Sequence, residues 1–223
     1  MNSAPIEGVG IVGATGPMGR GLAARLGVAG IPTLLGSRQP ERAVEAGLAI
    51  QEQLGASSGL VQGASNAEAA AYGDLVLFTV PYEPGLPLIS QLEERLQGRI
   101  LVSTAAPMEF RGGLAYPIRP EPGSAAQELA AVCPGAQVVG AFHTVSAAAL
   151  GHLEVALDED VIVTSDHPAA KELVVRLIGR LAGLQPVDGG GLVNAGFSEG
   201  LTPFLIRLNR LHHTNTGIRI TGL

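Results

Sequence analysis

The chain has 223 residues, of which 46% are apolar and 15% charged, and its formal net charge is −6. A charged share below the usual quarter or so favours a well-buried α/β core and argues against disorder. The negative charge argues against a general nucleic-acid-binding surface. Cys133 is the only cysteine, so the chain has no disulfide framework and no cysteine-based metal site, and we assign Cys133 no role.

No apolar run approaches the ~18 residues of a membrane span. Residues 1–7 are too few and too polar for a signal peptide. We therefore expect a soluble protein of the cytoplasm that binds neither membranes nor nucleic acids.

Apolar strands and helices alternate along the chain, which predicts a doubly wound parallel α/β sheet. The clearest strand is 74–80, a continuous apolar run of the kind found in parallel strands covered on both faces. Asn66 is expected to cap a short helix. Three segments lack a clear element: 55–63 is expected to be a loop, most of 104–136 has no assignment, and 217–223 is a tail with strand-like alternation. The expected strands are 8–13, 31–35, 74–80, 99–103, 137–142, 160–164 and 184–188, and the expected helices are 17–29, 40–54, 66–72, 85–97, 124–132, 167–181 and 197–211.

The N-terminal stretch GVGIVGATGPMGR predicts a strand, a glycine-dense turn and the start of a helix. Such a helix directs unpaired N–H groups and the positive end of its dipole at the turn. Gly16 would let the backbone approach a pyrophosphate, Gly19 would let the helix lie close to the strand, and Pro17 suits the first helical position. Ala14, preceded by Gly13, holds the first glycine position of the dinucleotide fingerprint G-x-G-x-x-G. The alternative is a plain glycine-rich turn.

The second expected strand ends in Gly36-Ser37-Arg38. An NAD-specific site places Asp or Glu at this point to hold the ribose 2′-hydroxyl. This chain has instead a hydroxyl and a guanidinium, with Arg42 one helical turn further along. Because guanidinium groups bind phosphate oxygens through paired N–H donors, the pattern favours NADP over NAD. The alternative is that Arg38 and Arg42 only mark a solvated helix start.

In an open parallel sheet, ligands bind beyond the carboxyl ends of the strands. The residues expected at these ends are small, hydroxylated or basic, as a cofactor crevice requires. They are Gly13–Thr15, Gly36–Arg38, Thr79–Pro81, Ser103–Ala105 and His143–Thr144.

Six segments in order along the chain resemble the NADP-dependent oxidoreductases of coenzyme F420, an 8-hydroxy-5-deazaflavin. They are GVGIVGATGPMGRGLAARL, LLGSRQPER, DLVLFTVPYE, VVGAFHTVSAA, SEGLTP and the closing GIRI. The resemblance runs from about Val9 to Ile220. It implies hydride transfer between NADPH and the deazaflavin, by a homodimer or larger homo-oligomer.

The same resemblance implies roles for single residues. It gives the phosphate turn, the 2′-phosphate site (with Arg42 where the family usually has Lys) and the contacts to nicotinamide and ribose. It also places His143 and Thr202, the expected catalytic residues, in the deazaflavin pocket. The expected cofactor-binding residues are Gly13, Thr15, Gly16, Pro17, Met18, Gly19, Ser37, Arg38, Arg42, Thr79, Val80, Pro81 and Ala147.

The resemblance further implies two parts, an NADP-binding Rossmann domain at 1–140 and a small C-terminal part at 141–223. Within the latter, 159–190 is expected to pack back on the sheet and 191–223 to cover the deazaflavin site. The chain departs from the family pattern at Gly196, where Arg is usual, and at Gly200, where Ser is usual. Arg219 in the tail could still meet an anionic phosphate arm.

Hydride transfer between two rings requires little acid–base work from the protein, because the cofactors carry the chemistry. The sequence therefore predicts a site poor in carboxylates and rich in small and apolar groups. His143 could hydrogen-bond the deazaflavin carbonyl or stabilise charge near N1 as the ring is reduced, or it could be a structural histidine. Thr202 could donate a hydrogen bond, or it could begin a turn before Pro203.

The sequence also contains features of other functions. The segment 196–200 matches the nucleophile motif G-x-S-x-G, but no Asp follows Ser198, which disfavours a serine hydrolase. The acidic run 158–160 is expected to be a solvated turn and not a metal site. An NADPH-dependent flavin (FMN or FAD) reductase stays open because of Gly196, and so does a non-catalytic NADP(H)-sensing protein. The retention of His143 and Thr202 argues against the sensor.

Overall fold

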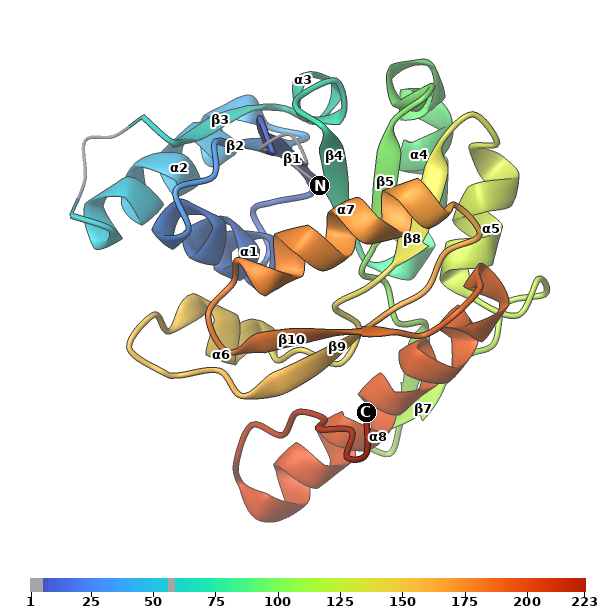
Figure 1. The fold of residues 1–223 in the computed structure, drawn as a ribbon. Coiled ribbons are helices and arrows are strands. Elements are labelled where there is room, and N and C mark those ends of the chain that lie inside the picture. The colour runs from blue at the N-terminus through green and yellow to red at the C-terminus, as the bar shows by residue number, and fades with distance from the viewer. Residues whose placement is uncertain (1–5, 56–58) are drawn as a thin grey trace.

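The computed structural model describes residues 6–55 and 59–223. Its central sheet has six parallel strands in the spatial order β3-β2-β1-β4-β5-β8 (Figure 1). This order is that of the doubly wound dinucleotide-binding fold, so the predicted α/β class is confirmed. The strands are β1 (Val9–Val12), β2 (Thr33–Ser37), β3 (Val61–Ser65), β4 (Leu75–Phe78), β5 (Ile100–Ser103) and β8 (Gln137–Gly140).

Helices cover both faces of this sheet, and each face has its own buried apolar cluster. On one face Leu22, Ile50 and Val174 come from three different helices and pack with strand residues such as Ile11. On the other face, helical residues such as Ile89 pack with Phe78 and its neighbours. The helices on the first face are α1 (Pro17–Val28), α2 (Pro40–Gln53) and α7 (Pro168–Gly179), and those on the second are α3 (Asn66–Ala70), α4 (Tyr82–Leu96) and α5 (Ala125–Val132).

The chain beyond the sixth strand adds a second small sheet. Strands β9 (Glu159–Val163) and β10 (Leu184–Asp188) pair in parallel. Both correspond to strands predicted from the sequence, at 160–164 and 184–188. Gly140 and Thr164 form a single antiparallel bridge that joins β9 to the edge of the central sheet. Figure 1 shows the pair running beneath α7, on the way to the last helix, α8 (Ala195–His212). The division into domains at residue 140 stays a prediction.

Four strands and α-helices of the described chain were not predicted. Strand β3 occupies part of the expected loop 55–63, of which residues 56–58 lie outside the described chain. A hairpin of β6 (Met108–Arg111) and β7 (Leu114–Pro117) lies in the unassigned stretch, and α6 (Ala147–Gly151) follows His143. These elements are short and carry little periodicity, so the sequence pattern could not separate them from loops.

Two local predictions were wrong. The cap of α3 is Ser65, whose hydroxyl accepts from the backbone N–H of Glu68 in a capping box, and not Asn66. The acidic run 158–160 is not a solvated turn, because Glu159 and Asp160 are buried at the start of β9. The tail 217–223, for which no element was predicted, forms no strand, although Ile218 O accepts from Asp160 N–H at 2.7 Å. One such hydrogen bond is too few to make a ladder. No helix in the described part of the chain is long and apolar enough to cross a membrane.

Helix α8 is fixed to the rest of the molecule by a buried carboxylate. Glu199 is 3% exposed and accepts hydrogen bonds from the first two N–H groups of α5, Ala125 N at 2.8 Å and Ala126 N at 3.1 Å. A Cβ on Gly196, one turn earlier, would lie 2.4 Å from Gly123 O. Burial raises the pKa of Glu199 to about 7, against the lowering effect of the two backbone hydrogen bonds.

The first prediction concerns the contact between α1 and the turn before it. A Cβ on Gly19 would lie 2.5 Å from Ala14 Cα, so the helix would have to move away from the turn. We expect Gly19→Ala to lower the free energy of unfolding by about 1–3 kcal/mol, as overpacking does. The control is Gly200→Ala in α8, where a Cβ meets nothing within 4 Å and stability should rise by up to ~1 kcal/mol. Equal effects in urea unfolding would contradict the prediction.

The second prediction concerns pH. Because the pKa of Glu199 is raised in the folded chain, the folded state binds the proton more tightly than the unfolded state between about pH 4.5 and 7. This contribution to stability is complete at low pH and is lost as the pH rises through about 7. The free energy of unfolding of the wild type, minus that of Glu199→Gln, should therefore fall between about pH 5 and about pH 8. A difference that is constant over this range would show that Glu199 keeps its ordinary pKa.

Candidate active site

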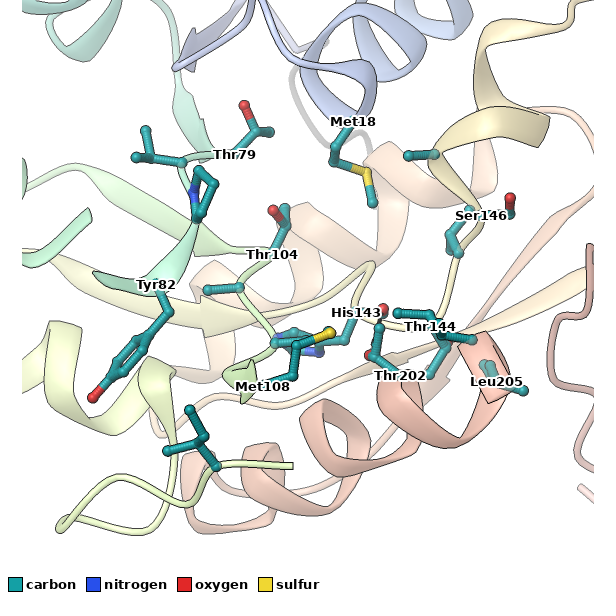
Figure 2. Close-up of a pocket in the computed structure, with 18 of the residues that line it drawn as sticks. Met18, Thr79, Tyr82, Thr104, Met108, His143, Thr144, Ser146, Thr202 and Leu205 are labelled. Carbon is teal, nitrogen blue, oxygen red and sulfur yellow. Dashed lines mark hydrogen bonds between the residues drawn. The ribbon is translucent and has the colours of Figure 1, made fainter. Parts of the chain in front are cut away.

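Two cavities meet at the carboxyl edge of the central sheet. The first, called here the turn cavity, has a volume of about 910 Å³ and lies against the β1–α1 turn and the ends of β2 and β4. The second, called the histidine cavity, has a volume of about 520 Å³ and lies between the end of β4, the chain after β8 and helix α8. Figure 2 shows Met18 and Thr79 above this cavity and His143 and Thr202 below it. Six residues line both cavities: Met18, Thr79, Val80, Pro81, Pro84 and Ala147.

The turn cavity gathers the residues predicted for the nucleotide. All of them line it except Gly19, which instead lets α1 lie against Ala14. Asn66 also lines the cavity and was not predicted for it. The set that lines it is Gly13, Thr15, Gly16, Pro17, Met18, Ser37, Arg38, Arg42, Thr79, Val80, Pro81 and Ala147.

The turn between β1 and α1 is held by hydrogen bonds on its inner side. Gly13 has a φ of +78°, a conformation that favours glycine, and its N–H donates to Asn66 Oδ1 at 3.1 Å. Ala14 N–H donates to Gly36 O at 2.9 Å. On the outer side, a Cβ on Gly16 would meet no atom closer than 3.9 Å. Pro17 begins α1, as predicted. A ligand backbone can therefore approach the turn at Gly16, in front of the helix N-terminus.

The far end of the turn cavity is basic. Ser37 ends β2 and is buried, and its Oγ accepts from Gln39 N–H at 3.2 Å, which leaves its own hydrogen free to donate. The side chains of Arg38 and Arg42 are exposed and line the same cavity. None of the residues described around this cavity is an Asp or Glu. This donor set suits a 2′-phosphate and lacks the carboxylate that would hold a free 2′-hydroxyl.

The junction of the two cavities is small and apolar. Thr79 follows β4, and both its N–H and its hydroxyl donate to Val12 O at 3.0 Å, which fixes its side chain. Ala147 begins α6, whose far end is held by Arg25 of α1 through hydrogen bonds to Ala149 O at 3.0 Å and Leu150 O at 3.1 Å. The walls of the junction are therefore uncharged and are held in place by hydrogen bonds on both sides.

His143 lies three residues beyond the end of β8, an edge strand of the central sheet. Its ring is buried at 4% exposure, and burial lowers its pKa to about 4. Nδ1 lies 3.2 Å from Ser198 Oγ of α8, whereas Nε2 has no hydrogen-bond partner in the described structure. The preceding residue, Phe142, is fully buried with a φ of +66°, which is rare for a bulky residue. Such strain beside a cavity is typical of functional sites.

Thr202 lies inside α8, which continues past Pro203. The alternative that Thr202 begins a turn before this proline is therefore wrong. Its hydroxyl donates to His143 O at 2.7 Å. The hydroxyl hydrogen is therefore engaged, and Thr202 Oγ1 could only accept a hydrogen bond from a ligand. Thr202 thus ties α8 to the chain that carries His143.

Other residues singled out in the sequence lie away from both cavities. Arg219 is paired with Asp158 at 2.9 Å and with Asp160 at 3.6 Å, which fixes the tail to the start of β9. Gly196 and Gly200 line neither cavity. Cys133 is buried in the apolar cluster beneath α5. The described residues contain no group of three or more His, Cys, Asp or Glu placed to hold a metal ion.

The histidine cavity also contains residues that sequence reasoning missed. Tyr82 lines it, and its hydroxyl donates to Glu128 at 2.6 Å; burial, together with Glu128, raises the pKa of Tyr82 to about 12. Met108 and Ile118 also line it. They come from the region of the β6–β7 hairpin, which no sequence pattern predicted. Exposed Glu83 is the one carboxylate among the residues described around this cavity, which is otherwise neutral.

Comparison with known proteins agrees with this geometry. Residues 8–107 match the family described as NADP oxidoreductase, coenzyme F420-dependent. The F420-dependent NADP reductase of Methanothermobacter thermautotrophicus is 36% identical over 96% of this chain and 95% of its own length. That of Methanocaldococcus jannaschii is 37% identical over 96% and 98%.

Solved structures show the same architecture. The crystal structure of a candidate F420-dependent NADP reductase from Arthrobacter sp. FB24 superposes with a TM-score of 0.81, at 26% identity over 98% of this chain and all of that one. Identity of more than a third over nearly the full length, together with this shared fold, settles the family. The chain belongs to the F420-dependent NADP oxidoreductases.

Proposed function

We propose that this chain transfers a hydride between NADP(H) and the 8-hydroxy-5-deazaflavin coenzyme F420. The observation that carries the proposal is the meeting of two cavities at one apolar junction, with a phosphate-binding turn and two arginines on one side only. One cavity suits a nucleotide with a 2′-phosphate, and the other suits a flat, largely uncharged ring system. When bound, the two rings supply the carbons between which the hydride moves.

The chain's own residues bind, orient and exclude water. The β1–α1 turn at Thr15, Gly16, Pro17 and Met18 offers backbone N–H groups to the pyrophosphate. Ser37, Arg38 and Arg42 hold the 2′-phosphate. Thr79, Val80, Pro81 and Ala147 form the walls against nicotinamide and its ribose. His143 and Thr202 lie at the wall of the deazaflavin cavity.

The C-terminal part acts as the cover of this second cavity. Leu205 and Asn209 of α8 and Thr216 of the tail line it, and Arg219 fixes the tail beside them. This supports the division proposed from the sequence, in which 191–223 cover the deazaflavin and 1–140 hold the nucleotide, although Ala147 also lines the nucleotide cavity. The expected cytoplasmic location stays a prediction.

The third prediction tests the reaction. Stopped-flow absorbance with NADPH should show rapid bleaching of oxidised deazaflavin, and slow or no bleaching of FAD and FMN in parallel runs. Arg38→Ala should raise the KM for NADPH about 10- to 100-fold, because one or two charged hydrogen bonds are lost, and should leave the weak activity with NADH unchanged. The control is Arg95→Ala, an exposed arginine of α4 that lines neither cavity.

The other outcomes identify the alternatives. Bleaching of FAD or FMN without the deazaflavin would identify a flavin reductase. Tight NADPH binding with no turnover of any acceptor would identify an NADP(H)-sensing protein. Equal activity with NADH and NADPH would refute the 2′-phosphate site.

We further propose a homodimer, formed through the outer face of α8. Three large apolar residues of this helix, at intervals of seven residues, are exposed: Phe197 at 67%, Phe204 at 55% and Leu211 at 70%. Val193, just before the helix, is 66% exposed. Apolar residues at one position of successive heptads lie along one face of a helix, as they do in helices that pair along their length. Two copies of α8 would cover each other's stripe in a closed, symmetric contact.

The fourth prediction tests this contact. We expect the double variant Phe197→Glu/Phe204→Glu to raise the dimer dissociation constant about 100-fold or more. The apolar area of two aromatic side chains would no longer be buried in the contact. The control is Leu48→Glu on α2, an apolar residue that is 60% exposed and far from α8 in the sequence. Sedimentation velocity gives the oligomeric state of each variant. A monomeric wild type, or a dimer that persists in the double variant, would overturn the proposed contact.

A further inference from the structure

The absence of a side chain at Gly140 makes space for the ring of His143 beside the sheet. A Cβ on Gly140 would lie 3.2 Å from His143 Cε1 and 2.7 Å from Thr164 Oγ1. Gly140 stands opposite Ser103 on β5 and opposite Thr164 beyond β9, so all three project from the same face of the sheet. The His143 ring therefore lies close to Gly140, and only its Nδ1 has a hydrogen-bond partner among the described residues.

The hydrogen bonds of Ser198 determine which nitrogen carries the proton. Ser198 Oγ donates to Ala195 O at 2.9 Å and lies 3.2 Å from His143 Nδ1. A serine hydroxyl has one hydrogen and two lone pairs. With its hydrogen donated to Ala195 O, Ser198 Oγ can only accept a hydrogen bond from the His143 ring. Nδ1 of His143 must then carry the N–H.

The other nitrogen is then a bare acceptor. With a pKa of about 4, the buried ring is neutral at physiological pH and has only one N–H. Nε2 of His143 has no partner in the described structure, and the hydroxyls of Ser103 and Thr164 on the same row also have none. A buried acceptor without a partner is costly, so a donor is expected to meet Nε2 when the site is filled.

We propose that Ser198 holds His143 as its neutral Nδ1–H tautomer, so that Nε2 accepts a hydrogen bond from an N–H or O–H of the molecule in the histidine cavity. This differs from the expectation that His143 donates to a ring carbonyl, since donation would need the proton on Nε2. Only the identity of the donor, a ring N–H or hydroxyl of the deazaflavin, rests on the proposed function. Ser198 is thus a positioning residue for the second substrate.

A side chain of the cavity wall must move for this contact to form, because Nε2 is covered in the structure. Two unbranched thioethers, Met18 and Met108, line the cavity. An unbranched thioether changes rotamer at little cost. These two side chains are therefore the parts of the cavity wall expected to move most easily.

The test is a long-range proton–nitrogen NMR spectrum of the purified protein labelled with ¹⁵N-histidine. The resonances of His143 are assigned as those that are missing from the spectrum of His143→Gln. We expect the pattern of the Nδ1–H tautomer for His143 without any ligand, and a shift of the Nε2 resonance when oxidised deazaflavin is added with NADP⁺. An Nε2–H pattern in the ligand-free wild type would overturn the proposal. The ligand-free spectrum does not depend on which substrate binds. A wrong tautomer can therefore be distinguished from a wrong proposed function.

Kinetics give a second readout. Ser198→Ala should raise the KM for the deazaflavin about three- to tenfold, the value of one ordinary hydrogen bond, and leave the KM for NADPH within about twofold. Ser198→Thr, which retains the hydroxyl, should restore most of the loss. The control is Ser90→Ala, an exposed serine of α4 that donates to Leu86 O at 3.3 Å in the same way. Equal KM values in Ser198→Ala and wild type, or an unmoved Nε2 resonance with deazaflavin bound, would refute the role of the pair.

Discussion

The close approach of α1 to the end of β1 is the constraint on which the site depends. Gly19 lies so near Ala14 that no side chain fits between them, and Gly13 turns the chain with a positive φ. Together they aim the N-terminus of α1 at the carboxyl edge of the sheet, where its unpaired N–H groups face the turn cavity. If α1 moved outward, Met18 and Ala147 would both leave the junction of the two cavities, because α6 is fixed to α1 through Arg25.

The second half of the site is fixed by one helix through three neighbouring polar residues. Within α8, Ser198 contacts the ring of His143, Thr202 contacts its backbone carbonyl, and Glu199 caps α5. Each of these groups is largely shielded from solvent, where hydrogen bonds are strong and an unmade one is costly. The helix can therefore adopt few positions over the cavity. The same helix leaves its outer apolar face uncovered, so the cover of the active site and the proposed dimer contact are coupled through one rigid element.

Much of this could be predicted from the sequence, for reasons that are local. The turn at Gly13–Gly19, the basic end of β2 and buried strands such as β4 each depend on consecutive residues, and the structure contains them. The hairpin at 108–117, the strand β3 and the contact between Ser198 and His143 could not be predicted, because each depends on partners far away in the chain or on short segments with little pattern. Gly196 shows the same limit: it looks like a change in the substrate site, whereas it allows α8 to pack on Gly123.

The distribution of charge explains how a protein with a net charge of −6 can hold an anionic nucleotide. Around the turn cavity the described side chains include Arg38 and Arg42 and no carboxylate, and the dipole of α1 adds positive potential at the same place. Beyond the junction the walls are nearly neutral, and His143 remains uncharged because it is buried. A hydride carries charge from one ring to the other, so a fixed charge at the junction would favour one direction of transfer. A neutral junction leaves that direction to the two coenzymes, while the arginines proposed to hold the 2′-phosphate line the other cavity only, away from the second ring.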